Sequence, residues 1–388
     1  MSRSARLGSG GVIGGRIALR VDPDALRRLA RGPTVVLVTG TNGKTTTALM
    51  LTRILETLGE VAGNGDGANM PDGVTAALVA KPHAPVAVLE VDENYVPAIA
   101  AQVRPACLVL LNLSRDQLDR VGEVRAIERD LRAVVATLPT TTVIANCDDP
   151  LVTSAALAAA RPIWVSAGQE WTGDAAACPR CGQVIFHTPK GWCCACGLTR
   201  PDPLWTAGAH TMRSADGRMV PLDLRLPGRA NAANAAIAVA TAERLGVSPT
   251  IAASQLRTIG EVAGRYRRAE VSGHTVRILL AKNPAGWRET LAVLDPGASV
   301  VIAINSSEAD GRDTSWLWDV PFDQLRGRHV VAAGDRATDL AVRLTYAEVQ
   351  HTISPQPLAA VVALPPGAVE VVANYTAFRD ITRRLDDA

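Results

Sequence analysis

Short apolar runs alternate with helical patterns in the first part of the chain. Four of these runs have the length of a strand, at residues 34–39, 86–91, 106–112 and 142–146. Runs that are apolar at nearly every position are typical of strands buried on both faces of a sheet. Because helical patterns lie between them, the sequence predicts a parallel α/β sheet.

A second alternation of strands and helices begins near residue 270. Its strand candidates are residues 276–280, 300–304, 330–333 and 369–372. Between the two alternations, residues 171–205 break the rhythm, and residues 229–245 form an alanine-rich helical pattern. We therefore predict an α/β protein with an N-terminal segment, a central domain that carries an insertion, and a smaller C-terminal α/β domain. The predicted bounds are 1–33, 34–268 with the insertion at 171–205, and 269–388.

The composition indicates a folded protein and disfavours two kinds of partner. Of the 388 residues, 47% are hydrophobic and 20% charged, as in a chain with a buried core. The net charge is only +2 and the sequence has no dense basic block, so it does not indicate the basic surface typical of a nucleic-acid-binding protein. No apolar stretch reaches the roughly eighteen residues of a membrane span, and the N-terminal arginines precede no apolar signal core. We expect a cytoplasmic protein whose cysteines are reduced or bind metal.

The segment after the first predicted strand has the pattern of a phosphate-binding loop. Residues 38–47 read Val-Thr-Gly-Thr-Asn-Gly-Lys-Thr-Thr-Thr and open a predicted helix. Glycines at two of these positions allow a tight turn whose backbone amides converge on phosphate oxygens. The lysine is placed to bridge the β- and γ-phosphates, and the threonine after it to bind magnesium. The predicted nucleotide contacts from this loop are Thr41, Asn42, Gly43, Lys44, Thr45 and Thr46.

The form Gly-Thr-Asn-Gly-Lys-Thr-Thr resembles the ATP loop of the Mur ligase superfamily, which includes peptidoglycan ligases and folylpolyglutamate synthases. Further segments match in family order: Glu90, residues 112–119 with Gln117 in place of a histidine, residues 228–234, and Gly264-Arg265. The resemblance implies ATP-dependent activation of a substrate carboxylate as an acyl phosphate.

The same resemblance assigns roles to individual residues. It implies that Thr45 and Glu90 hold magnesium and that Asn234 contacts the nucleotide. Lys44 and Glu90 are the catalytic candidates at this site, because magnesium and lysine must neutralise the phosphates before a carboxylate can approach. Asp92 and Glu93 lie close by, but side chains alternate at a strand end, so only some of them can face the site.

Five of the seven cysteines lie in the insertion and suggest a metal site. Cys178 with Cys181, and Cys193 with Cys196, form two Cys-x-x-Cys pairs separated by eleven residues. Four thiolates in this arrangement suit a tetrahedral structural zinc ion without catalytic function. Cys194 is expected to lie outside the ligand set. The alternative is a group of reduced cysteines or a redox pair.

The C-terminal part narrows the resemblance within the superfamily. Residues 282–287 read Lys-Asn-Pro-Ala-Gly-Trp, residues 310–319 Asp-Gly-Arg-Asp-Thr-Ser-Trp-Leu-Trp-Asp, and residues 374–377 Asn-Tyr-Thr-Ala. Together with the cysteine insertion, this order resembles the ligase subunits of two-subunit amidating enzymes. The loop also begins too early for a preceding UDP-binding domain.

That resemblance implies a reaction and a partner. The ligase subunit uses ATP to convert the α-carboxyl of D-glutamate in the lipid II stem peptide to D-isoglutamine, through an acyl phosphate. The ammonia comes from a separate glutaminase subunit of the GatD type, so the protein would form a heterodimer and work at the inner face of the membrane. The resemblance further implies that an aspartate of the chain completes the glutaminase site, for which Asp313 is preferred over Asp310 and Asp319.

Two other functions stay open at this stage. A different Mur-like ligase, which adds an amino acid to folate or to a UDP-sugar peptide, would share the ATP loop. A zinc-ribbon protein regulated by a nucleotide, without ligase chemistry, is the alternative from another class.

Overall fold

The computed structural model describes residues 12–65, 67–114, 121–168, 175–189, 191–262, 265–307 and 310–387. Parts of three predicted motifs lie outside these residues, namely residues 115–119, residues 171–174 and 190 of the insertion, and Gly264. The described residues fall into two compact units, one from the first 260 residues and one from residue 261 onward. Among the described residues, no helix combines the length and the apolarity that crossing a bilayer requires.

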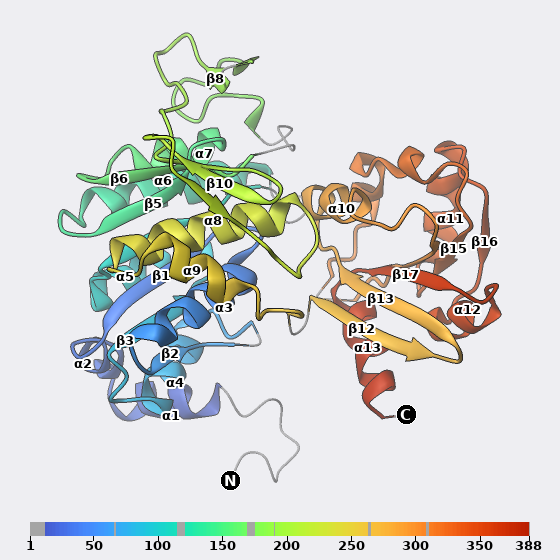
Figure 1. The fold of residues 1–388 in the computed structure, drawn as a ribbon, viewed down its shortest axis with the longest axis horizontal. Helices are drawn as coiled ribbons and strands as arrows, with labels where there is room; N and C mark the ends of the chain where they lie inside the picture. Colours follow the sequence, from blue (N-terminus) through green and yellow to red (C-terminus); the bar gives the residue numbers. More distant parts are fainter. Residues whose placement is uncertain are drawn as a thin grey trace. The chain divides into compact units, whose positions relative to one another are not determined.

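The first unit is built on a nine-stranded sheet with the order β11-β10-β9-β6-β5-β4-β1-β3-β2 (Figure 1). Its strands are β1 (Thr34–Thr39), β2 (Val61–Gly63), β3 (Val86–Glu90), β4 (Cys107–Leu110), β5 (Thr142–Asn146), β6 (Pro162–Ser166), β9 (Trp205–Ala207), β10 (Thr211–Ser214) and β11 (Met219–Pro221). Its helices are α1 (Ile13–Val21), α2 (Ala25–Leu29), α3 (Lys44–Leu55), α4 (Pro71–Ala80), α5 (Val96–Val103), α6 (Val121–Ala136), α7 (Pro150–Ala156), α8 (Arg229–Arg244) and α9 (Pro249–Leu256), with short 3-10 turns η2 (Glu56–Leu58) and η3 (Glu93–Tyr95).

Strand β1 lies inside this sheet, between β3 and β4, and pairs with both in parallel. Val35 and Leu37 pack into the core formed with α2, α4, α5, α6 and α7. Val36 and Val38 point to the opposite face, the side covered by α3, α8 and α9, and are equally buried. Burial of both faces explains why β1 reads as an uninterrupted apolar run. The parallel sheet predicted from four such runs is present.

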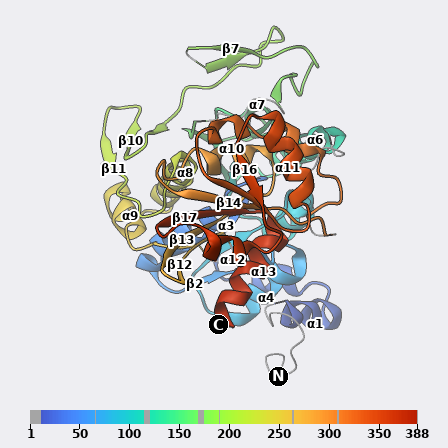
Figure 2. The same cartoon turned by 90° about the vertical axis from the view of Figure 1, so that its right-hand side faces the viewer.

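The cysteine-rich insertion forms a separate lobe on the first unit. Two short strands, β7 (Phe186–Thr188) and β8 (Gly191–Cys193), pair in an antiparallel ribbon that stands off the main sheet in both views (Figures 1 and 2). Its own core is small and consists of Cys178, Ile185, Trp192, Cys194 and Leu198. A core of this size needs further support, from contacts with the sheet or from a metal ion.

The second unit has a six-stranded sheet with the order β12-β13-β17-β14-β15-β16. Its strands are β12 (Tyr266–Val271), β13 (His274–Leu280), β14 (Ser299–Ala303), β15 (Val330–Ala333), β16 (His351–Ile353) and β17 (Ala368–Ala373). Its helices are α10 (Pro284–Leu291), α11 (Ala337–Tyr346), α12 (Pro357–Ala363) and α13 (Tyr375–Asp386), with 3-10 turns η6 (Ser315–Asp319) and η7 (Phe322–Leu325). The four strands predicted for this part correspond to β13, β14, β15 and β17.

The strands that the hydrophobic pattern did not predict are mostly short or at a sheet edge. Strands β9 to β11 have three or four residues each; β9 continues the sheet in parallel with β6, and β10 pairs antiparallel with both β9 and β11. Strand β12 lies at the edge of the second sheet and alternates between half-buried and exposed positions. Too few apolar positions distinguish such strands from loops.

A buried ion pair holds the centre of the second sheet to the connection that precedes β14. Glu370 of β17 is 2% exposed, and its carboxylate accepts two hydrogen bonds from Arg277 Nε, at 2.8 and 3.0 Å. Arg277 also donates to the carbonyl of Val293 at 2.9 Å, and the backbone N–H of Asp295 donates to Glu370 at 3.2 Å. The pair therefore connects two strands and one loop.

We predict that Glu370→Gln lowers the free energy of unfolding of the second unit by about 3 kcal/mol, because Arg277 keeps its charge and loses its partner. Urea denaturation measures the change. Asp386→Asn is the matched control, since Asp386 pairs with Arg267 but is 66% exposed. We expect its cost to stay below about 1 kcal/mol. Equal losses in the two variants would contradict a special role for the buried pair.

Candidate nucleotide and metal sites

The loop between β1 and α3 exposes the amides of a helix N-terminus. The first hydrogen bond of α3 runs from the N–H of Thr47 to the carbonyl of Gly43, at 2.9 Å. The four preceding amides, of residues 43–46, are thus the helix-end donors, which have no intrahelical acceptor. Gly43 has a φ of 86°, the left-handed conformation that lets the chain turn into the helix. This geometry suits an anion such as a phosphate.

The Lys44 side chain lies along the loop and is 7% exposed. Its Nζ donates to the carbonyl of Gly40 at 2.6 Å and to Glu93 Oε2 at 3.1 Å. Of the two acidic residues after β3, therefore, Glu93 faces the lysine. Asp92 accepts from the N–H of Asn94 and so caps η3.

Glu90 and Thr45 form a second polar pair in this region. The hydroxyl of Thr45 donates to Glu90 Oε2 at 2.9 Å, and Glu90 is 2% exposed. The side chain of Asn64 bonds to the backbone N–H and carbonyl of Glu90, at 2.8 and 2.7 Å. A hydroxyl and a carboxylate in contact are oxygen ligands of the kind that magnesium prefers. The donor set therefore fits the ion implied by the sequence.

Asn234, in the first half of α8, lies against the phosphate loop. A Cβ atom added at Gly43 would lie 2.6 Å from Asn234 Oδ1, so the two residues are in close contact. Asn234 is 9% exposed, and Thr46, in the first turn of α3, is 5% exposed. The structure thus brings together the nucleotide-contact residues that were predicted from segments almost 200 residues apart.

The segment after β4 holds the loop in place. Asn112 Oδ1 accepts from the N–H of Asn42 at 2.9 Å, and Asn112 Nδ2 donates to the carbonyl of Asn42 at 3.0 Å. The carbonyl of Asn112 accepts from the N–H of Thr41, and the N–H of Ser114 donates to the Thr41 hydroxyl, both at 2.9 Å. The backbone amides of Thr41 and Asn42 therefore fix the loop to the segment after β4.

Asn64 has no signal in the sequence that distinguishes it from a surface polar residue. Glu93 stands out only as one of two acidic residues near Glu90, and Asn112 and Ser114 only as members of a family-like segment. The pairing of Asn112 with the loop depends on the parallel register of β1 and β4, in which Thr39 lies opposite Leu110. Sequence spacing alone does not determine that register.

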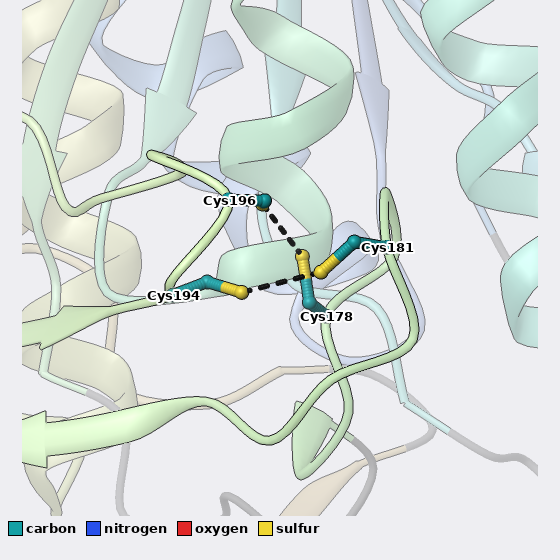
Figure 3. A group of neighbouring side chains, drawn as sticks. All are labelled: Cys178, Cys181, Cys194 and Cys196. Carbon is teal, nitrogen blue, oxygen red and sulfur yellow. Dashed lines mark hydrogen bonds between the residues drawn. The ribbon is translucent and has the colours of Figure 1, made fainter.

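The metal-ligand candidates come together, with one exchange. The Sγ atoms of Cys178, Cys181, Cys194 and Cys196 all lie within 4.8 Å of one another, and Figure 3 shows them pointing toward a common centre. The Sγ atoms of Cys181 and Cys194 are 3.4 Å apart, and those of Cys178 and Cys196 are 3.6 Å apart. A tetrahedral ion with Zn–S bonds of about 2.3 Å keeps its sulfurs about 3.8 Å apart, so the group fits zinc.

The prediction that Cys193 is the fourth member of this group is wrong, because Cys194 takes that place. Cys193 ends β8, where alternate side chains point to opposite faces. Trp192 and Cys194 therefore face the lobe core while Cys193 faces away. The second turn also begins one residue later than in the first pair: the N–H of Gly197 donates to the carbonyl of Cys194, three residues before it, whereas the N–H of Gly182 donates to the carbonyl of Cys178, four residues before it.

The thiol environments differ within the group. The backbone N–H of Leu198 donates to Cys196 and, together with hydrogen bonds from neighbouring thiols, lowers its pKa to about 7. Burial raises the pKa of Cys178. Outside the lobe, burial also raises the pKa of Cys107 to about 11, and that of Cys147 to about 12, so these two thiols are unreactive at neutral pH.

The three acidic candidates in the second unit have different environments. Asp313 is exposed, and its carboxylate accepts from the N–H and the hydroxyl of Ser315, both at 2.8 Å. These bonds hold the pKa of Asp313 below its usual range. Asp310 instead accepts from the N–H of Thr376 at 2.9 Å and from its hydroxyl, so it anchors the start of α13. Asp319 ends η6 and is half-buried.

Buried aromatic packing and hydrogen bonds from Arg343 fix the turn that carries Asp313. Trp316 packs against Trp287 with ring centroids 5.8 Å apart, and both are buried. Arg343 of α11 donates to the carbonyls of Leu317 and Val320, at 3.0 and 2.8 Å. Trp316 is thus a core residue under this turn, whereas Trp318 is 55% exposed.

Comparison with known proteins agrees with this architecture. Residues 38–242 match the Mur ligase middle domain, and residues 280–378 match the MurT ligase C-terminal domain. Among solved structures, a pseudomurein peptide ligase type C from Methanothermus fervidus superposes with a TM-score of 0.71 at 20% identity, covering 94% of this chain and 81% of that one. The fold is thus that of a Mur ligase, and the loop is of the type expected for its ATP-binding domain.

Two curated relatives narrow the assignment. Subunit MurT of the glutamine-hydrolysing lipid II isoglutaminyl synthase from Staphylococcus aureus is 30% identical over 87% of this chain and 83% of its own length. The corresponding subunit from Streptococcus pneumoniae is 31% identical over 88% and 83%. The chain belongs to the MurT family of the Mur ligase superfamily. It is an ATP-dependent ligase with a role in peptidoglycan synthesis.

Proposed function

We propose that the protein uses ATP to amidate the α-carboxyl of D-glutamate in the stem peptide of lipid II, giving D-isoglutamine. The observation that carries this proposal is the similarity to the MurT subunits along most of the chain, including the C-terminal domain at residues 280–378. A UDP-N-acetylmuramate–L-alanine ligase matches over 48% of its own length and a UDP-N-acetylmuramoylalanine–D-glutamate ligase over 75%, against 83% for the MurT subunit. The match of residues 280–378 to the MurT C-terminal domain favours the amidating enzyme over a UDP-sugar-peptide ligase.

The reaction requires two transfers. A carboxylate oxygen of the substrate attacks the γ-phosphorus of ATP, and ADP leaves with the bridging oxygen. Ammonia then attacks the acyl carbon, inorganic phosphate leaves, and the nitrogen releases a proton. The amides of residues 43–46 and Lys44 would bind the phosphates, and Asn234 would contact the nucleotide beside Gly43.

Two anions must approach each other in the first transfer, so charge neutralisation is the main task of the site. Thr45 and Glu90 would hold magnesium, which neutralises phosphate charge when bound. Lys44, extended along the loop, would contact the transferred phosphate. Ammonia is uncharged as the nucleophile, so the second transfer needs no further cation.

We infer that a glutaminase subunit of the GatD type supplies the ammonia, and that Asp313 completes its Cys-His site. Asp313 is exposed and anionic, on a turn held by Trp316 and Arg343. An aspartate in this state can orient a histidine and stabilise its charged form. Asp310 is less suited, because Thr376 and Ser307 engage its carboxylate. The lipid-linked substrate would place the heterodimer at the inner face of the cytoplasmic membrane.

We further infer that Cys178, Cys181, Cys194 and Cys196 bind a structural zinc ion. The small core of the lobe gives a physical reason, since metal binding contributes folding energy where apolar burial is limited. Four thiolates close the coordination sphere and leave no position for a reacting water.

Lys44→Ala is expected to reduce ATP-dependent amidation at least about 100-fold, because the transferred phosphate loses its cation. Phosphate release and amide formation with ammonium as donor measure the effect. Lys81→Ala is the matched control: Lys81 also bonds a carbonyl and lies near a carboxylate, but away from the loop. Amidation near the wild-type rate in Lys44→Ala would overturn the assignment of the site.

The zinc proposal separates two adjacent cysteines. We expect about one zinc ion per chain, lost in Cys194→Ser and in a Cys178→Ser/Cys181→Ser variant but retained in Cys193→Ser, because only Cys194 points into the group. Elemental analysis of protein purified without chelator gives the stoichiometry. If zinc is lost in Cys193→Ser but retained in Cys194→Ser, the ligand is Cys193, as the Cys-x-x-Cys spacing predicts. Wild-type protein that contains no zinc would refute the metal site.

The partner proposal predicts different results with two nitrogen donors. Alone, the protein should amidate its substrate with ammonium but hardly with glutamine, and added glutaminase subunit should make glutamine effective. Asp313→Asn should reduce glutamine-driven amidation about 100-fold or more, because the partner's histidine loses its carboxylate. Ammonium-driven amidation should stay unchanged, since carboxyl activation takes place at the ATP site.

Asp310→Asn is the matched control for this variant. The amide oxygen can still accept from the N–H of Thr376, but the amide nitrogen replaces the oxygen that accepts from the N–H of Ser307. The anchor of α13 is therefore weakened, and we expect a lower melting temperature and similar losses with both donors. If Asp313→Asn affects both donors equally, Asp313 serves the ligase site or the fold. If glutamine-driven activity survives in Asp313→Asn and in Asp319→Asn, the shared site is refuted.

A further inference from the structure

The turn between β5 and α7, residues Cys147–Asp149, contacts both the cysteine-rich lobe and the segment that holds the phosphate loop. Its two aspartates are adjacent in sequence and divide these contacts between them. Asp148 bonds toward the lobe, and Asp149 bonds toward the loop segment. The arrangement suggests a connection between two sites that the sequence places about 140 residues apart.

On the lobe side, Arg200 Nε donates to Asp148 Oδ1 at 2.6 Å. The N–H of Gly168 donates to Asp148 Oδ2, also at 2.6 Å. The indole N–H of Trp192, a member of the lobe core, donates to the carbonyl of Cys147 at 3.1 Å. These bonds join the lobe to the turn through both backbone and side chain.

On the loop side, Asp149 is fully buried, at 0% exposed. Its Oδ1 caps α7 by accepting from the N–H groups of Leu151 and Val152, at 2.8 and 3.1 Å. Its Oδ2 accepts from the N–H of Leu113 at 2.8 Å. A helix cap needs only the first of these oxygens, so the second bond has a different role.

Leu113 lies between the two residues that fix the phosphate loop. Asn112 bonds to Asn42 on one side, and Ser114 bonds to Thr41 on the other. Asp149 therefore sets the position of the segment from which the loop is held. In a site built from positioned groups, a misplacement of about 1 Å can cost roughly 100-fold in rate.

We propose that Asp149 is a positioning residue for the nucleotide site, and that through the turn Cys147–Asp149 the cysteine-rich lobe contributes to nucleotide affinity. The inference rests on the proposed nucleotide site at residues 43–46. It adds that an intact lobe is needed for full affinity of that site.

Asp149→Asn is the variant that tests the loop contact. The amide oxygen can still cap α7, whereas the amide nitrogen would face the N–H of Leu113, so a donor would meet a donor. We expect the Kd for ADP, measured by titration calorimetry on the full chain, to rise about tenfold. Unchanged affinity in this variant would overturn the proposal.

A matched control separates this effect from general destabilisation. Glu370→Gln also replaces a buried carboxylate with its amide, but in the second unit. It should lower the melting temperature and leave the Kd for ADP unchanged. If Glu370→Gln weakens ADP binding as much as Asp149→Asn does, the effect is one of stability and the proposal fails.

The lobe contact is tested by Trp192→Phe, which keeps the ring and removes the N–H donor to Cys147. We expect a rise of roughly threefold in the Kd for ADP, smaller than in Asp149→Asn because Arg200 still holds Asp148. This variant also keeps the proposal testable if Asp149→Asn does not fold. Wild-type affinity in Trp192→Phe and in Arg200→Gln would refute the contribution of the lobe.

Linkage supplies a readout that does not depend on the variants' activity. If the lobe favours ADP binding, ADP must stabilise the lobe by the same factor. The rate at which a disulfide reagent modifies the exposed Cys181 and Cys196 should therefore fall when ADP is added, and Asp149→Asn should abolish that protection. If wild type binds no ADP at all, the proposed nucleotide site fails. If it binds ADP without protecting these thiols, only the coupling fails.

Discussion

The architecture of the nucleotide site depends on one pairing, between the Asn112 side chain and the backbone of Asn42. A loop that binds phosphate needs amides directed at an empty space, and such a loop is not stable unless other groups satisfy the rest of its backbone. Here the segment after β4 accepts and donates those hydrogen bonds. Everything else at the site, including the direction of Lys44 and the contact of Asn234 with Gly43, follows from the loop being held in that shape.

The second unit has the same kind of pairing, between an asparagine side chain after one strand and the backbone after the neighbouring parallel strand. Asn374, directly after β17, accepts from the N–H of Asn305 at 3.0 Å and donates to its carbonyl at 2.7 Å. Asn305 follows the neighbouring strand β14. In both units an asparagine after one parallel strand therefore joins the segment after the next. The carboxyl ends of parallel strands are where α/β proteins place their sites, and an amide side chain can satisfy one N–H and one carbonyl there at once.

The sequence was sufficient for the features that depend on local pattern. The strands buried on both faces, the glycine loop before α3 and the Cys-rich insertion all have such patterns, and the C-terminal motifs distinguished the family. It was insufficient where a contact depends on register or on the length of a turn. Cys194 rather than Cys193 points into the thiol group because the second turn is one residue shorter than the first. Glu93 rather than Asp92 reaches Lys44 because η3 rotates the chain after β3.

The ion pair between Lys44 and Glu93 has a consequence for how a nucleotide enters the proposed site. A buried ammonium group without an anion would be costly, and Glu93 removes that cost before any ligand arrives. Entry of a triphosphate is then an exchange, in which the lysine passes from one anion to another. The Glu93 carboxylate must then pair with another cation or bind water. Glu93 therefore competes with the ligand, and the strength of nucleotide binding reflects the difference between two ion pairs, not the gain from one.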